Sequence, residues 1–130
     1  MLGSFSPGIR RLRLLPSALG VDVVSAADSS NRKALTGMVG WGLKRNTQRA
    51  VTTAAKFQLP YYTLEDGFIR SIGLGVLNTD PFSFIVDCRG IYYDATRPSD
   101  LEQLIIECPA PNFKRAEKLI RRIVTEKISK

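Results

Sequence analysis

The chain has 130 residues, of which 44% are hydrophobic and 24% charged, as in soluble globular domains and unlike disordered segments; this is room for one domain or for one lobe of a larger protein. It contains no histidine and two cysteines, which excludes Ser-His-Asp and Cys-His catalysis, histidine-ligated zinc and a structural zinc site. We predict no metal and no cofactor. The formal net charge of +7 lies wholly in residues 1–60, which hold nine Lys and Arg residues against two acidic ones.

The N-terminal third combines a basic segment, a polar linker and a strand. Residues Ser4 to Leu19 are partly amphipathic and end before Gly20, which predicts a short helix. Residues 25–32 are rich in Ser, Asp and Asn and indicate a linker. Residues 34–39 then predict a short buried strand that ends in Gly40-Trp41-Gly42.

A helix and a second strand follow. Asn46 or Thr47 can cap a helix that runs to about Phe57, and residues 60–64 form the next predicted strand. The three elements complete a β-α-β unit with a right-handed crossover. We therefore expect an α/β fold with a mainly parallel sheet, in which ligands bind at the carboxyl ends of the strands.

The C-terminal half predicts a hairpin and two helices. Residues 82–87 and 91–94 flank a short loop that contains glycine, which favours a β-hairpin. Ser99 and Glu102 have the spacing of a capping box at the start of a helix. The last segment, residues 112–129, places its apolar side chains on one face of a predicted helix, and this face must pack against this lobe or a second domain.

The most informative segment follows the strand at 60–64. Glu65 and Asp66 lead into Gly67, and Arg70 and Ser71 come directly afterwards. Carboxylates, a flexible glycine and a cationic side chain at the end of a strand can together transfer a proton and bind an anion. A plain Asp-Gly turn without a functional role explains the same residues. Side chains of consecutive extended residues point to opposite faces, so the two carboxylates cannot act as a facing pair.

A second candidate site is the Gly40-Trp41-Gly42 loop before the helix. A helix N-terminus offers backbone N–H groups to a phosphate, and Lys44 adds a positive charge. The loop lacks the dinucleotide fingerprint and the P-loop lysine, so the pattern is unspecific. Asp94, in the predicted hairpin, is a weaker candidate that a structural role explains equally well.

The uneven charge restricts the partners. A basic half favours nucleic acid, an anionic membrane surface or a phosphorylated substrate, whereas a solvated basic face is the neutral explanation. No nucleic-acid signature accompanies the charge, so we expect no specific nucleic acid. Arg10, Arg11 and Arg13 interrupt the N-terminal apolar residues where a signal peptide would need its core, so we expect a cytoplasmic protein, with peripheral contact to an anionic membrane surface left open.

Three ordered motifs together resemble one family. They are Gly40-Trp41-Gly42-x-Lys44, then residues 64–75 (LEDGFIRSIGLG), then residues 87–102 with the pattern Asp-x-x-Gly-Ile-Tyr-Tyr-Asp-Ala-Thr-x-Pro-Ser-x-Leu-Glu. The series, with Ser6-Pro7-Gly8-Ile9 at the N-terminus, resembles the capsule polysaccharide biosynthesis proteins of the KpsC/LipA type. The resemblance covers nearly the whole chain.

The resemblance implies a retaining β-Kdo glycosyltransferase. Such enzymes of Gram-negative bacteria transfer Kdo, an acidic eight-carbon sugar, from CMP-Kdo to a lipid-linked Kdo primer for capsule synthesis and export. They have two Rossmann-like lobes in a GT-B-like module, with the active site between them. In this context Glu65 is the candidate acid/base, Asp66 braces Gly67 or holds Arg70, and Arg70 grips a carboxylate or phosphate, with Ser71 and Lys44 nearby.

Family members are much longer than this chain, which matches one lobe. We therefore expect residues 1–130 to form a single Rossmann-like lobe on the acceptor side, with the nucleotide-binding lobe and the nucleophilic aspartate absent and no activity alone. The alternative is a non-catalytic α/β module that binds anions or nucleic acid.

Overall fold

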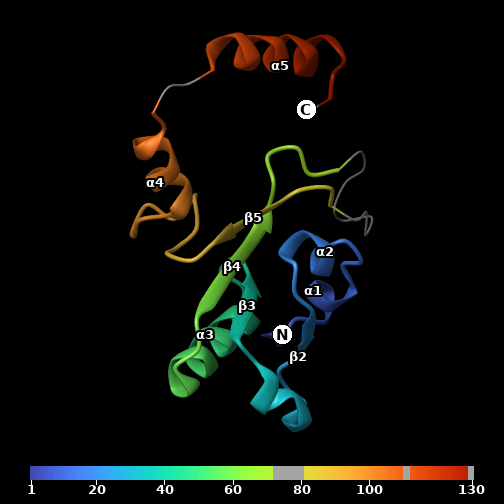
Figure 1. Ribbon diagram of the computed structural model, residues 1–130, viewed down its shortest axis with the longest axis vertical. Helices are drawn as coiled ribbons and strands as arrows, with labels where there is room; N and C mark the ends of the chain where they lie inside the picture. Colours follow the sequence, from blue (N-terminus) through green and yellow to red (C-terminus); the bar gives the residue numbers. More distant parts are fainter. Residues whose placement is uncertain (72–80, 110–111, 129–130) are drawn as a thin grey trace.

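The computed structural model describes residues 1–71, 81–109 and 112–128. Its centre is a five-stranded mixed sheet in the order β2-β1-β3-β4-β5 (Figure 1). The strands β1 to β4 run parallel to one another, and β5 at the edge runs antiparallel to β4. The predicted α/β fold with a mainly parallel sheet is confirmed. The strand bounds are β1 Leu2–Ser4, β2 Val23–Ser25, β3 Gly37–Trp41, β4 Tyr61–Asp66 and β5 Phe84–Asp87.

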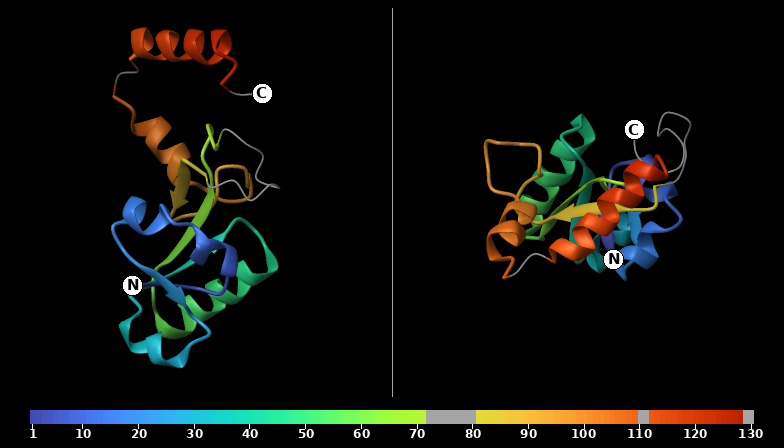
Figure 2. Two further views of the ribbon diagram at one scale, coloured as in Figure 1. Left: turned by 90° about the vertical axis from the view of Figure 1, so that its right-hand side faces the viewer. Right: turned by 90° about the horizontal axis from the view of Figure 1, so that it is seen from above.

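Helices cover both faces of the sheet (Figures 1 and 2). On one face, α1 (Pro7–Arg11) and α2 (Leu15–Leu19) bury a cluster that includes Ile9, Leu15 and Leu64. On the other face, α3 (Arg45–Phe57) packs its alanines on Met38. Each buried aliphatic side chain contributes roughly 1.5–3 kcal/mol, so these two clusters fix β3 and β4 at the centre. The remaining helices are η1 (Ser29–Ala34), α4 (Asp100–Glu107) and α5 (Phe113–Thr125).

The N-terminal prediction of one short helix is wrong in detail. Residues Leu2 to Ser4 form a strand, and the helix is split into α1 and α2. Pro16, in the first turn of α2, lacks an N–H and cannot continue a preceding helix, so it starts a new one. The end of α2 at Gly20 is confirmed, because this glycine adopts the left-handed conformation with φ +66°. The polar linker is partly a 3-10 helix.

The β-α-β unit is confirmed as β3, α3 and β4, with β3 and β4 parallel. The cap predicted for α3 at Asn46 or Thr47 is wrong: the helix begins at Arg45, and Lys44 is the N-cap residue. The Thr47 hydroxyl donates instead to the Trp41 carbonyl oxygen at 3.0 Å. This bond ties the start of α3 to the end of β3.

The predicted hairpin is also wrong. The segment 84–87 is a strand, but it pairs with β4, and residues 91–94 form a turn. The cause is Asp87, whose buried carboxylate accepts the backbone N–H groups of Arg89 at 2.8 Å, Gly90 at 2.7 Å and Asp100 at 3.0 Å. These bonds turn the chain back after β5 and compete with strand pairing.

The two C-terminal helices form as predicted. The capping box of α4 is complete: the Ser99 hydroxyl accepts the Glu102 N–H at 3.2 Å, and the Glu102 carboxylate accepts the Ser99 N–H at 2.7 Å. Asn112 caps α5, which ends at Thr125 rather than near 129. Across residues 1–71, 81–109 and 112–128, no helix has both the length and the apolar character needed to span a bilayer.

We predict that Asp87→Ala lowers the free energy of unfolding by roughly 3 kcal/mol, because it leaves three backbone N–H groups without their acceptor. Chemical denaturation measures the loss. The control is Asp22→Ala, which removes an exposed carboxylate and should change stability by less than about 0.5 kcal/mol. Equal losses in the two variants would contradict the structural role of Asp87.

Candidate functional site

Glu65 lies at the carboxyl end of β4, where three segments of the chain meet. Its Oε1 accepts the indole N–H of Trp41 at 3.2 Å and the backbone N–H of Asp66 at 3.0 Å, and its Oε2 accepts the Tyr93 hydroxyl at 3.1 Å. Three donors therefore fix the orientation of one half-buried carboxylate. Held as an acceptor, it is placed to take a proton from a group bound beside it.

Gly42 makes this arrangement sterically feasible. It has φ +53°, and a Cβ there would lie 2.9 Å from both Glu65 Oε2 and the Tyr93 hydroxyl oxygen. Its own N–H donates to the Leu64 carbonyl at 2.9 Å, so the loop after β3 follows β4 closely. Gly40, two residues earlier and within β3, is buried against Tyr61 and Thr47. The Gly40-Trp41-Gly42 segment thus positions Glu65.

Asp66 has different partners. Its Oδ1 pairs with Arg70 Nε at 2.7 Å, and Arg70 also donates to the Ser71 hydroxyl at 3.0 Å. The two neighbouring carboxylates therefore belong to separate groups of side chains, as strand geometry requires. The structure brings Asp66, Arg70 and Ser71 together, and Asp66 holds Arg70. Residues 72–75 of the same motif lie outside the described residues.

Gly67 does not form the predicted turn. The strand β4 extends through Asp66, and the Gly67 N–H donates to the Ser83 carbonyl at 3.0 Å. A Cβ on Gly67 would collide with the Ser83 side chain. Glycine is required here by the close approach of two extended segments, and the Glu65-Asp66-Gly67 segment continues the sheet instead of leaving it.

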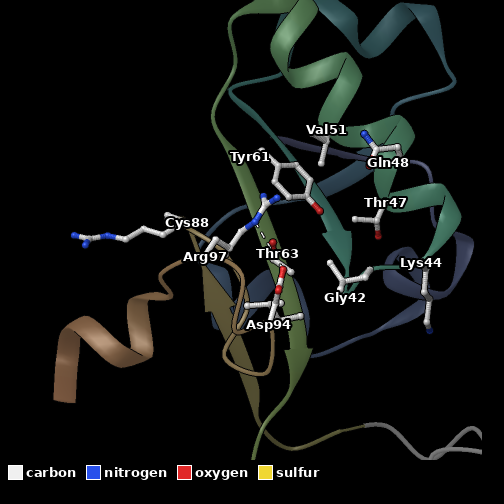
Figure 3. Close-up of a pocket in the computed structure, with 14 residues that line it drawn as sticks. Gly42, Lys44, Thr47, Gln48, Val51, Tyr61, Thr63, Cys88, Asp94 and Arg97 are labelled. Carbon is white, nitrogen blue, oxygen red and sulfur yellow. Dashed lines mark ion pairs between the residues drawn. The ribbon is translucent and has the colours of Figure 1, made fainter. Parts of the chain in front are cut away.

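A cavity of about 330 Å³ lies between α3, β4 and the segment 88–97. Glu65 does not line it, but Gly42 does, and a Cβ on Gly42 would lie 2.9 Å from Glu65 Oε2. Figure 3 shows Lys44 and Thr47 on one side of the cavity, and Asp94 and Arg97 on the other. Arg97 Nε lies 3.7 Å from Asp94 Oδ2, and hydrogen bonds from Thr96 lower the pKa of Asp94. The sequence candidates Gly42, Lys44 and Asp94 thus share one cavity with cations at its rim.

The N-terminus of α3 faces this cavity. Its N-cap residue Lys44 makes no side-chain cap, and the first turn contains no acidic residue. The positive end of the helix dipole is therefore not compensated by a side chain of the helix itself, a condition that favours an anion. Burial raises the pKa of the Tyr61 phenol on the cavity wall, partly offset by Thr63 and Thr47, so this group stays neutral.

Sequence reasoning missed two residues of the site. Tyr93 is part of the third motif but is not among the predicted site residues, and Arg97 stands at an unspecified position of that motif. Desolvation, and then the negative charge of Glu65, raise the pKa of Tyr93. The sequence signal for both residues was the Tyr-Tyr-Asp turn after a strand. Only the fold shows that this turn brings Tyr93 back to β4.

Comparisons with known proteins agree on one family. A family model described as capsule polysaccharide biosynthesis protein matches residues 36–129. The chain is 46% identical over 128 residues to the capsule polysaccharide modification protein LipA of Neisseria meningitidis serogroup B, which covers 96% of this chain and 18% of LipA. It is 46% identical over 69 residues to the lipopolysaccharide-processing protein LpsZ of Rhizobium meliloti, covering 53% of this chain and 16% of LpsZ.

Two solved structures from Thermosulfurimonas dismutans share the fold. The KpsC beta Kdo 2,4 transferase matches 99% of this chain with a TM-score of 0.84 and 40% identity. The KpsC beta Kdo 2,7 transferase matches 95% with a TM-score of 0.59 and 28% identity. The chain covers 40% and 42% of these structures and less than a fifth of LipA.

We predict that Gly42→Ala displaces Glu65 and Tyr93, because the new Cβ occupies their contact. Trp41, the sole tryptophan, donates to Glu65, so its fluorescence emission should shift to longer wavelength. The matched control is Gly20→Ala, which imposes the same left-handed strain with nothing within 4 Å of the Cβ. An unchanged Trp41 emission in Gly42→Ala would contradict the packing described.

We also predict that Glu65→Gln lowers the pKa of Tyr93, because the nearby negative charge is lost while the desolvation remains. An absorbance titration of the phenol, corrected with a Tyr93→Phe variant, measures the change. In the unmodified chain the raised pKa means that the folded state favours the neutral phenol. This contribution to stability is complete below pH about 10 and is lost as the pH rises through the higher folded pKa.

Proposed function

The chain belongs to the capsule polysaccharide biosynthesis protein family, and on that premise we propose that it forms the acceptor-side lobe of a retaining β-Kdo transferase. The complete enzyme moves Kdo from CMP-Kdo to a lipid-linked Kdo primer. A second lobe binds the nucleotide and supplies the nucleophile, so this lobe has no activity alone. Both Thermosulfurimonas relatives are named as Kdo transferases, which supports Kdo as the transferred sugar. This chain covers only 40% and 42% of their structures, which supports an enzyme with a second lobe.

The observation that carries the proposal is the fixed Glu65 carboxylate. It lies at the carboxyl end of β4, the edge at which α/β sheets bind ligands. Three donors hold it against Gly42, which lines a cavity with cationic groups. A preorganised carboxylate next to an anion-favouring cavity suits an acidic sugar. The same group can then act on a hydroxyl of that sugar.

Retention through a covalent intermediate needs a nucleophile and an acid/base, about 5–5.5 Å apart in the glycosidase analogy. The phosphate of CMP leaves as an anion and needs no proton, so the base acts in the second half of the reaction. There Glu65 accepts the proton of the attacking acceptor hydroxyl. Trp41 and Tyr93 hold the carboxylate for this step.

The cationic groups then bind the Kdo carboxylate of the acceptor. Lys44 and Arg97 line the cavity, and the N-terminus of α3 adds backbone N–H groups. Arg70 stays bound to Asp66 and adds positive charge on the opposite side of β4. We place the lobe in the cytoplasm of a Gram-negative cell, in the pathway of capsule synthesis and export, with peripheral access to a lipid-linked acceptor at the inner membrane.

A non-catalytic anion-binding module is the second candidate. The same cavity favours it, because Lys44, Arg97 and the end of α3 bind an anion without Glu65 taking part. Nucleic acid binding would need a salt-dependent affinity for single or double strands. Catalysis and plain anion binding make opposite predictions for a Glu65 variant in a two-lobe protein.

We predict no transfer from CMP-Kdo to a Kdo-terminated glycolipid by the isolated chain. A chimera in which residues 1–130 replace the matching two-fifths of the Thermosulfurimonas 2,4 transferase should be active. In that chimera, Glu65→Gln should lower kcat roughly 100-fold or more, because the base is lost. The control is Asp22→Asn, which changes an exposed carboxylate before β2 that does not line the cavity and should keep the full rate.

Two results would contradict the proposal. Turnover by the isolated chain would show that no second lobe is needed. A Glu65→Gln chimera with undiminished kcat would remove Glu65 from the acid/base role and favour the anion-binding module.

A further inference from the structure

The helices α4 and α5 expose an unusual amount of apolar surface. Soluble monomers rarely leave several large apolar side chains of neighbouring elements in water. On α4 the exposed side chains are Leu104, Ile105 and Ile106, at 66%, 67% and 77% exposure; on α5 they include Phe113, Ile120 and Val124, at 70%, 61% and 70%.

The exposure of α5 has a regular pattern. Its apolar residues recur every three or four positions and form one stripe, whereas its basic residues lie on the opposite side. No residue of α5 is buried, and Figures 1 and 2 show the helix apart from the sheet. Such a stripe is the pattern of a helix that packs on protein or lipid, and the described residues of this chain do not cover it.

We propose that α4 and α5 together are a docking arm for a second lobe, equivalent to the polypeptide that makes up the rest of the Thermosulfurimonas 2,4 transferase. The match to that protein includes 99% of this chain, and therefore both helices, yet it covers only 40% of the relative. Three-fifths of the relative's chain is thus available to cover the arm. The proposal rests on the proposed function, in which a second lobe completes the enzyme, and it identifies α4 and α5 as the surface that binds this lobe.

Charge and geometry favour a protein over a membrane. The helix α5 carries five basic residues and one acidic residue, as a membrane-surface helix would. The helix α4 carries three acidic residues and no basic one, so an anionic surface repels it. Its three consecutive apolar residues lie 100° apart and span about 200° of the helix, which a flat lipid surface cannot cover.

The arm is also linked to the site. The Asp100 carboxylate at the start of α4 accepts the backbone N–H of Cys88 at 2.6 Å and pairs with Arg89 at 3.1 Å. The buried Asp87 binds the Asp100 N–H. These contacts join α4 to the segment that carries Tyr93 toward Glu65. A lobe docked on α4 is thereby held in a fixed position relative to the Glu65 carboxylate.

The test compares Val124→Glu with Thr125→Glu. The two positions are adjacent at the end of α5. Val124→Glu adds a negative charge to the apolar stripe, and Thr125→Glu adds the same charge to the opposite side of the helix. In the isolated chain neither variant should change the melting temperature, because both side chains are exposed. In the chimera, Val124→Glu should lower the melting temperature by roughly 3 °C or more, and Thr125→Glu should not.

Every other outcome overturns the proposal. Equal melting temperatures for the two chimera variants would mean that the stripe is not buried, and an unfolded chimera beside a folded isolated chain would mean that the arm does not accept that lobe. Sedimentation of the isolated chain as a dimer that Val124→Glu dissociates would identify a second copy as the occupant. Binding of the isolated chain to phosphatidylglycerol vesicles that Val124→Glu abolishes would identify lipid. None of these measurements depends on Kdo transfer, so they can fail independently of the proposed activity.

Discussion

The buried carboxylate of Asp87 determines how the second half of this protein is arranged. It ends β5, and it accepts N–H groups both from the turn that follows and from the first residue of α4. One side chain thus bends the chain back toward β4 and sets the start of a helix. A buried carboxylate of this kind is tolerated only with such complete hydrogen bonding, so the turn and the start of the helix share one set of hydrogen bonds.

The same constraint reaches the candidate site through the sheet. In the antiparallel register Glu65 lies opposite Ile85, two residues before Asp87, and the turn after Asp87 carries Tyr93 over to the Glu65 carboxylate. On the other side, the parallel register places Trp41 opposite Leu64. The Glu65 carboxylate is therefore located by strand pairing on both sides and oriented by one donor from each neighbouring segment. Its position follows from the fold and not from a flexible loop.

Elements with strong local signals could be predicted from the sequence. The β3-α3-β4 unit, the Ser99–Glu102 capping box and the stripe of α5 depend on residues a few positions apart. The strands β1 and β2 have three residues each, too few to show alternation. The hairpin prediction failed because Asp87 forms hydrogen bonds that a pattern of apolar residues does not reveal. Glu65 could be named from its motif, whereas Tyr93, 28 positions away, could be placed beside it only by tertiary structure.

The carboxylates around Glu65 also explain why a second lobe is needed for the proposed chemistry. A retaining mechanism requires a second carboxylate facing the first. Among the described residues near the site, Asp66 is paired with Arg70. Asp94 accepts hydrogen bonds from Thr96 and lies next to Arg97. Asp87 is buried and accepts backbone N–H groups. Each is engaged in holding the lobe together, and strand geometry turns Asp66 away from Glu65. On the proposed mechanism, the nucleophile must then approach from outside this lobe, on the partner that we propose docks on α4 and α5.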